Sequence, residues 1–215
     1  NSYPQINNDI YREPQSGIMV KKTKGSSGLS EPMAIYQLKV TLDRIRPPIW
    51  RRIQVRGDIS LFKLHKILQE VMGWYDCHLH QFLIDGESYS IISREADILG
   101  DDFKDEKKFR LDRIIPGEKF KFVYEYDFGD SWYHTILVEK ILQPKEELKH
   151  PICLKGKRSA PQEDCGGTSG YVHVLRAFRN PKHPDHEDIM NWLEEGYDPE
   201  RFNVHEVNER LIKIR

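Results

Sequence analysis

The chain has 215 residues, of which 38% are hydrophobic and 31% are charged, so it is long enough to form one domain with a sizeable core. Its net charge of -1 excludes a global electrostatic attraction to nucleic acid or to a membrane surface. No apolar run approaches the roughly 18 residues of a membrane span and no secretory signal pattern is visible, so we expect a cytoplasmic protein without a membrane partner. The three cysteines, Cys77, Cys153 and Cys165, have no CxxC spacing and indicate reduced thiols.

Residues 1–33 lack hydrophobic periodicity, and we interpret them as a flexible leader, in part vector-derived, ahead of a single domain at 34–215. Alternating apolar residues predict strands over 35–42 and 49–55, and the prolines within 46–48 predict the turn between them. Arg51 falls on the apolar face of the second strand. Either a bulge shifts the register there, or Arg51 reaches a buried acid.

A helix is predicted from Leu61 to Met72, where apolar residues recur at the spacing of one helix face. Ser60 is the expected N-cap and Gly73 the expected end of this helix. A strand over 80–84, a turn at 85–86 and a short strand around Tyr89 follow. Residues 94–108 are charged and irregular, which predicts a surface loop.

Residues 120–142 carry the clearest strand signal of the chain. Aromatic residues at 120, 122, 124 and 126 alternate with polar ones, a Gly-Asp pair predicts a turn, and a second alternating run begins at Trp132. A loop of two or four residues would place Asp127 opposite Trp132 and Glu125 opposite His134. We therefore expect Glu125, Asp127 and His134 on the face opposite the two tyrosines of the first strand.

Residues 144–162 are rich in lysine, with prolines and a glycine, and are predicted to form a long loop. Helices are predicted over 171–178, 185–193 and 204–212, because prolines and a glycine separate these three stretches. A hairpin, a helix, further strands and then helices make an α+β pattern. We expect a mixed β-sheet roll of β-grasp-like character, covered by the helix at 61–72, with a C-terminal group of helices.

Four motifs occur in order along the chain: Met72-Gly73-Trp74, His78-Leu79-His80-Gln81-Phe82, the aromatic stretch 120–134, and Pro161-Gln162-Glu163-Asp164-Cys165-Gly166-Gly167. Together they resemble the plasmid pRiA4b ORF-3-like family over roughly residues 35–212. The resemblance implies the family's fold but no established activity. Some relatives are named as passenger proteins of an insertion element, which implies a link with mobile elements. The family pattern has a cysteine ahead of the last motif where this chain has Ala160, so no metal site made of loop cysteines is implied.

His78 and His80 lie two residues apart on a predicted strand, hence on one face, where two imidazoles can bind a divalent metal. Further ligands would come from the hairpin and the loop: Asp127, Asp130, His134, Glu163, Asp164 and Cys165. The metal hypothesis is the set His78, His80 and Asp127. In the alternative, one histidine hydrogen-bonds backbone or an acid and the other is exposed, because an isolated HxH has no recognised metal spacing.

Asp127, Glu163 and Asp164 are the candidate catalytic residues. A carboxylate close to another carboxylate can have a raised pKa and act in acid–base chemistry. Cys165 would be a nucleophile if the following helix lowered the pKa of its thiol. The structural alternative is that the glycines form a tight turn, Asp164 or Thr168 caps the helix and Cys165 is buried and inert.

A polar ligand pocket is predicted where these motifs would meet, and its expected members are Trp74, His78, His80, Tyr126, Asp127, Asp130, Trp132, His134, Glu163, Asp164, Cys165 and Tyr171. For the aromatic members, packing in the core is the alternative. The chain lacks the GxxxxGK[ST], GxGxxG, GxSxG and HExxH motifs, which sets aside the enzyme classes that depend on them.

The segment 39–66 is basic, and its arginines are the residues that would contact a nucleic acid: Arg44, Arg46, Arg51, Arg52 and Arg56. A solvated basic surface is the alternative, because no known base-reading motif accompanies them. The leading functional hypothesis is a binding or interaction module with a polar pocket and with a protein or nucleic acid as partner. A metal-assisted hydrolase acting on a phosphate or amide, with a divalent metal as cofactor, is the first alternative. A nucleic-acid accessory protein is the second.

Overall fold

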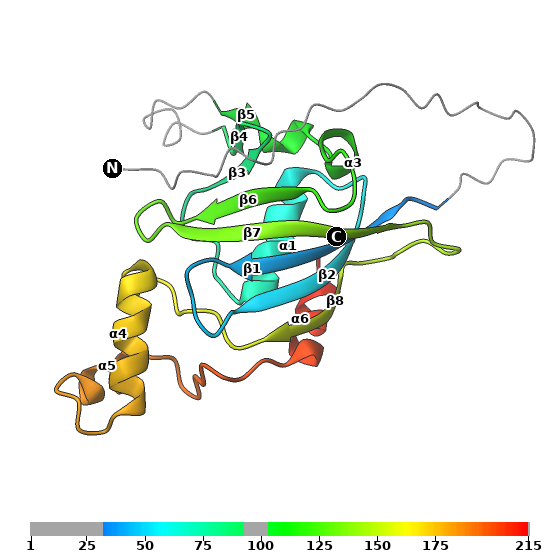
Figure 1. Cartoon of the computed structure of the whole chain (residues 1–215). Coiled ribbons are helices and arrows are strands. Elements are labelled where there is room, and N and C mark those ends of the chain that lie inside the picture. The colour runs from blue at the N-terminus through cyan, green and yellow to red at the C-terminus, as the bar shows by residue number, and fades with distance from the viewer. Residues whose placement is uncertain (1–31, 93–102, 215) are drawn as a thin grey trace, which may run out of the picture. The chain divides into compact units, whose positions relative to one another are not determined.

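The computed structural model describes residues 32–92 and 103–214, and these contain an eight-stranded sheet in the order β5-β4-β3-β6-β7-β1-β2-β8 (Figure 1). The strands are β1 Ile35–Leu42, β2 Trp50–Arg56, β3 His80–Ile84, β4 Glu87–Ser90, β5 Lys104–Asp105, β6 Lys121–Tyr126, β7 Trp132–Leu142 and β8 Ile152–Lys157. All neighbouring strands are antiparallel except β4 and β5, which are parallel. The mixed α+β class is thus confirmed. The β-grasp-like detail is not confirmed, since β1 lies between β2 and β7 and is antiparallel to both.

Helices form in the four chain segments where the sequence predicts them, and the described residues contain two further short helices, at 106–108 and 111–114, that were not predicted. They are α1 Leu61–Met72, the short 3-10 helix η2 Glu106–Lys108, α3 Leu111–Ile114, α4 Gly167–Arg179, α5 His186–Trp192 and α6 Val204–Leu211. The predicted caps of α1 are confirmed: Ser60 Oγ accepts a hydrogen bond from Lys63 N, and Gly73 ends the helix with a left-handed φ of 82°.

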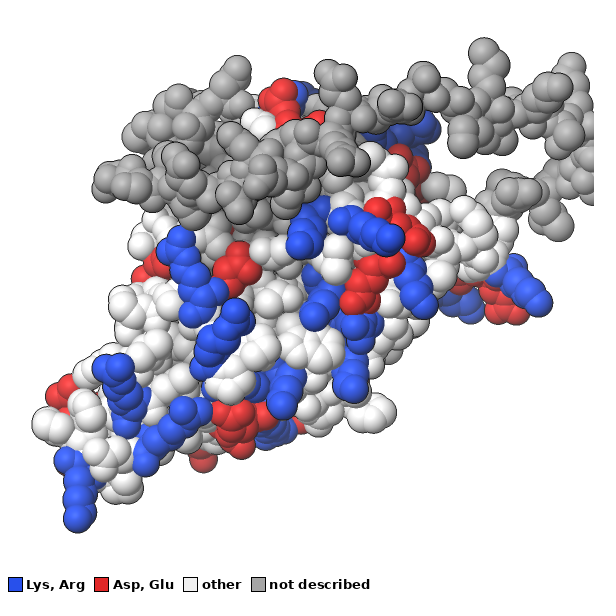
Figure 2. All heavy atoms as spheres, viewed as in Figure 1, with Lys and Arg blue, Asp and Glu red and all other residues white. Residues whose placement is uncertain are grey.

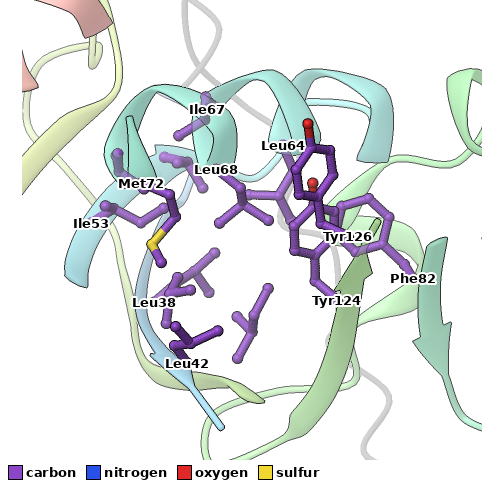
Figure 3. Packing of buried hydrophobic residues seen from close by; sticks show 14 of the residues in the cluster. Leu38, Leu42, Ile53, Leu64, Ile67, Leu68, Met72, Phe82, Tyr124 and Tyr126 are labelled. Carbon is purple, nitrogen blue, oxygen red and sulfur yellow. The ribbon is translucent and has the colours of Figure 1, made fainter. Parts of the chain in front are cut away.

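The hydrophobic core lies between α1 and the face of the sheet on which α1 packs (Figure 3). Alternate residues of the central strands point to this face, among them Leu38, Ile53 and Tyr124, and the apolar stripe of α1 meets them through Leu64 and Leu68. Each of these five side chains is fully buried. No helix within residues 32–92 and 103–214 is long and apolar enough to cross a membrane.

The β6–β7 hairpin is confirmed, but its predicted register is wrong by one residue. Tyr126 lies opposite Trp132, and Tyr124 lies opposite His134. The connection has five residues, 127–131, and its first and last residues, Asp127 and Ser131, have positive φ values of 58° and 53°. Because side chains alternate in a strand, the shift turns His134 onto the buried face with the tyrosines instead of the opposite face.

The prediction of one long loop over 144–162 is also wrong, because β8 forms within it and pairs with β2. The sequence of β8 lacks a clear strand pattern. β8 is an edge strand with two exposed lysines, Lys155 and Lys157, and an internal glycine. Gly156 is required by packing, since a Cβ there would lie 2.6 Å from the ring of Phe202. In the predicted loop 94–108, the described part forms β5 and η2.

Arg51 points into the core side of the sheet and is 2% exposed. It reaches no acid. Its Nε donates to Val71 O at 2.7 Å near the end of α1, its Nη1 donates to two further backbone carbonyls, and its guanidinium lies 4.1 Å from the ring centre of Phe202. Burial lowers the pKa of Arg51 to about 10. The predicted leader at 1–33 lies outside the described residues apart from 32 and 33.

Candidate functional site

Three segments that are far apart in sequence meet beside the end of the β6–β7 hairpin: residues 74–80 after α1, the hairpin turn 127–131, and the loop 161–167. Trp74 Nε1 donates to Pro161 O at 2.9 Å, which joins the first segment to the third. The Asp130 carboxylate accepts from Gly166 N at 3.1 Å, which joins the second to the third. A Cβ on Gly167 would lie 2.6 Å from Asp130 O, so this close approach requires glycine. We name this region the three-segment junction.

Glu163 is buried at the centre of the three-segment junction. Its Oε1 accepts from the Tyr126 hydroxyl at 2.5 Å, and its Oε2 accepts from Tyr75 N at 3.0 Å. The Cys77 thiol lies 3.6 Å from Oε1. Burial and the adjacent carboxylate raise the pKa of both Tyr126 and Cys77, so both remain protonated at neutral pH. Glu163 therefore fastens the loop to the sheet.

His78 faces two carboxylates, one from the hairpin turn and one from the loop. Its Nε2 lies 3.2 Å from Asp164 Oδ1 and 3.8 Å from Asp127 Oδ2. This nitrogen is shielded from solvent and makes no hydrogen bond of acceptable geometry with any described residue. Asp127 is held by its other oxygen, Oδ1, which accepts from Gly129 N at 2.9 Å and Asp130 N at 3.3 Å. The junction thus brings together one imidazole and two carboxylates.

His80 does not join this group, although the sequence predicted it to share a metal with His78. Its Nε2 lies 2.9 Å from the buried Glu106 carboxylate, and its ring stacks on His65 with centres 3.4 Å apart. His65 Nε2 lies 2.7 Å from Asp76, and burial lowers the pKa of His65. The two histidines separate because His78 precedes β3, where strand alternation does not hold, whereas His80 is the first residue of the strand.

Four other predicted pocket members are largely enclosed in the protein: Trp132, His134, Cys165 and Tyr171. Trp132 and Tyr171 are 1% exposed. His134 is fully buried, and burial lowers its pKa to about 4. Burial and the nearby Asp130 raise the pKa of Cys165 to about 12, so the structure does not support the thiolate nucleophile.

The five predicted nucleic-acid arginines do not form one surface. Arg51 is inside the protein. Arg52 pairs with Glu139 at 2.6 Å, and Arg56 pairs with Asp58 and Glu147. Arg44 and Arg46 are exposed in the β1–β2 connection.

Two groups of potential metal ligands escaped the sequence reasoning. Cys77 lies with His78 and Glu163 so that one ligand atom of each is within 4.8 Å of the others. His173, His183 and Asp185 form another such group near α4 and α5. The sequence gives only weak signals for these groups: Cys77 is next to His78, and His183 is close to Asp185. The third members, Glu163 and His173, are brought near only by the fold.

The fold and the junction define an α+β protein with one face of its sheet covered by α1 and a polar site at one end of the central hairpin. Comparison with known proteins identifies its family. The model of the "Plasmid pRiA4b ORF-3-like protein" family matches residues 34–206, and the chain belongs to this family.

Two relatives cover most of the chain. The uncharacterized protein y4hQ of Sinorhizobium fredii (strain NBRC 101917 / NGR234) is 33% identical over 180 residues, which are 83% of this chain and 91% of that protein. The crystal structure of the protein of unknown function MM3350 from Methanosarcina mazei Go1 is similar with a TM-score of 0.71 and 36% identity, over 81% of this chain and 97% of that one. The family resemblance is confirmed, and these two relatives are described as uncharacterized and of unknown function.

Proposed function

We propose that the protein is a binding module whose three-segment junction takes one divalent cation through His78, Asp127 and Asp164. The observation that supports the proposal is the convergence of one imidazole nitrogen and two carboxylate oxygens within 4.8 Å of one another, from three separate segments. A mixed nitrogen and oxygen ligand set suits first-row ions such as Zn²⁺ or Mn²⁺. Gly129 N in the hairpin turn donates a hydrogen bond to Asp127 Oδ1 and so orients the carboxylate. Metal-binding carboxylates are commonly held by hydrogen bonds of this kind.

The ligand spacing agrees with this assignment. Ligand atoms about 2.0–2.2 Å from one ion lie roughly 3.3–3.6 Å apart in tetrahedral geometry. The separations of His78 Nε2 from the two aspartates, 3.2 and 3.8 Å, need only small side-chain rotations to reach that range. The Asp164 side chain is 72% exposed, which leaves the site open to solvent and to a ligand that completes the coordination.

Metal-assisted hydrolysis is the second candidate, and the proximity of Glu163 to the cluster favours it. A bound ion would lower the pKa of a water molecule, and Glu163 or one of the aspartates would act as base. However, both oxygens of Glu163 already accept hydrogen bonds, from Tyr126 and Tyr75. For this reason we propose binding as the function and assign Glu163 a structural role.

Equilibrium metal binding tests the proposal. The protein is purified without a metal-affinity step, stripped with EDTA and titrated with Zn²⁺ and Mn²⁺ in a His173→Ala, His183→Ala background, so that the second ligand cluster does not contribute. We expect a stoichiometry near one. The variant Asp164→Asn should bind at least tenfold more weakly, and asparagine tolerates the positive φ of 60° at this position.

Glu209→Gln is the matched control, because Glu209 is exposed on α6 and takes no part in the cluster. Binding that is absent in the parent protein, or equal in the parent and Asp164→Asn, would overturn the proposal. Turnover of phosphoesters or amides by the metal-loaded parent, lost in Asp164→Asn, would instead select the hydrolase.

A further inference from the structure

The face of the sheet opposite α1 carries a line of cations. Strand register places Lys155 opposite Arg52, Arg52 opposite Lys39, Lys39 opposite Leu137, and Leu137 opposite Lys121. Lys39, Arg52 and Leu137 alternate with buried residues in their strands, so they point away from the core. Lys121 and Lys155 are themselves exposed. Five strands about 4.8 Å apart give the line a length of roughly 19 Å. We name it the basic row.

This arrangement is unfavourable in the isolated protein. Like charges directly opposite each other on neighbouring strands destabilise a sheet. Arg52 alone in the row has an ion-pair partner within the described part of the chain, namely Glu139. Lys39, Lys121 and Lys155 have no carboxylate within ion-pair distance among those residues. The row therefore retains uncompensated positive charge on a protein whose net charge is -1.

One aromatic ring accompanies the row on the same face. Trp50 lies two residues from Arg52 in β2, opposite Thr41, with Lys39 Nζ 5.5 Å and the Arg52 guanidinium 5.4 Å from its ring centre. Lys157 is opposite Trp50 in the register. Figure 2, in the same view as Figure 1, shows Lys and Arg side chains spread over these strands between smaller acidic groups. Aromatic residues next to cations on an open sheet provide stacking surfaces for bases beside contacts for phosphates.

We propose that the open face of β8, β2, β1, β7 and β6 binds single-stranded nucleic acid, with phosphates along the basic row and a base stacked on Trp50. A single strand is favoured over a duplex because a duplex hides the faces of its bases, leaving Trp50 without a role. A single strand is also favoured over an acidic peptide, because a peptide of acidic residues has no base to stack on Trp50. This proposal is independent of the cation site and differs from the predicted arginine set, since Arg51 is buried and lysines replace it.

Fluorescence anisotropy with labelled dT20 and rU20 oligonucleotides tests this proposal. EDTA is present throughout, so that the proposed cation site does not contribute, and the salt concentration is varied from 50 to 200 mM. We expect affinity to fall with salt. The double variant Lys39→Gln, Lys155→Gln should weaken binding at least tenfold and reduce the slope of log K against log salt by about 1.4, close to 0.7 per lost phosphate contact on a single strand.

The matched control is Lys107→Gln, Lys213→Gln, which removes the same charge at exposed positions on η2 and just after α6, outside the sheet. It should bind as the parent does. Trp50→Leu should weaken binding at least fivefold and leave the salt slope unchanged, because stacking releases no counterions. Circular dichroism confirms that each variant is folded.

Three results would overturn the proposal. The first is no binding at 50 mM salt, and the second is equal weakening in the two lysine double variants. The third is duplex DNA, heparin or polyglutamate binding as tightly as dT20 with no effect of Trp50→Leu, which would make the face a general polyanion or acidic-peptide surface.

Discussion

Arg51 shows how a buried charge is accommodated without an acid. Its hydrogen bonds go to the carbonyls of Val71, Trp50 and Lys157, which include one from the last turn of α1, where the helix dipole is negative. The guanidinium therefore links the sheet to α1. A methionine in its place would remove all three hydrogen bonds, including the buried one to Val71 O.

We expect Arg51→Met to lower the free energy of unfolding by about 3 kcal/mol, since an unsatisfied buried group costs about 1–3 kcal/mol. Arg52→Met is the matched control, because its partner Glu139 lies near the surface, where an ion pair contributes about 1 kcal/mol or less. Urea denaturation of both variants measures the difference. Equal losses would contradict the structural role of Arg51.

His134 makes the stability depend on pH. Burial lowers its folded-state pKa to about 4, whereas an unfolded histidine titrates near 6.5. As the pH falls from 6.5 to 4, the unfolded chain binds a proton that the folded protein does not. The stabilisation is thus complete above pH 6.5 and declines below it, by up to about 3 kcal/mol.

His134→Gln should reduce the slope of the unfolding free energy against pH by up to about 1.4 kcal/mol per pH unit between pH 4.5 and 6.5. His65, whose pKa burial also lowers, acts in the same direction and accounts for part of the slope that remains. The exposed His205 provides the control variant, His205→Gln, which should keep the parental slope. The prediction fails if both variants behave alike.

At the scale of elements, the contact between the hairpin turn and the 161–167 loop depends on Gly167. A methyl group there would meet Asp130 O at 2.6 Å, and Gly167 also has a positive φ of 65°. Gly196 has a similar φ of 76°, but a Cβ there would have no neighbour within 4 Å. Alanine at Gly196 therefore measures only the free-energy cost of a left-handed backbone, whereas alanine at Gly167 adds the cost of the steric clash with Asp130.

Gly196→Ala should cost about 1 kcal/mol of stability and leave metal affinity unchanged. Gly167→Ala should cost more, and it should weaken divalent-cation binding at least tenfold because the loop carrying Asp164 moves away from His78. Urea denaturation and metal titration measure the two effects. Similar behaviour of the two variants would show that the close approach does not position the proposed ligands.

At the scale of the whole molecule, the proposed cation links the loop, the hairpin and the segment after α1. A ligand that binds only the folded state stabilises it by about 2.7 kcal/mol at one hundred times its Kd. For a chain of this size we expect Tm to rise by roughly 5–10 °C on adding the ion. Calorimetry with and without EDTA, in the His173→Ala, His183→Ala background, measures the shift. The same rise in Asp164→Asn would contradict the assignment.

Local sequence was sufficient for most of the elements. Ser60 and Gly73 frame α1, and the alternating aromatics of 120–126 predict β6, because caps and periodicity are properties of neighbouring residues. The three C-terminal helices were predicted for the same reason. β8 was missed, because the glycine that weakens its pattern is explained by Phe202, almost fifty residues away.

For the candidate site, the residue pattern alone was enough to identify the motifs with polar chemistry. The fold class followed from the order of the predicted strands and helices, and the family from the order of the motifs. Which of these residues meet depended on the three-dimensional fold. A five-residue turn with two left-handed residues buried His134, and the start of β3 directed His80 to Glu106 while His78 faces Asp127 and Asp164. Strand register and turn length depend on packing across the whole sheet, and a shift of one residue moves a side chain from one face to the other.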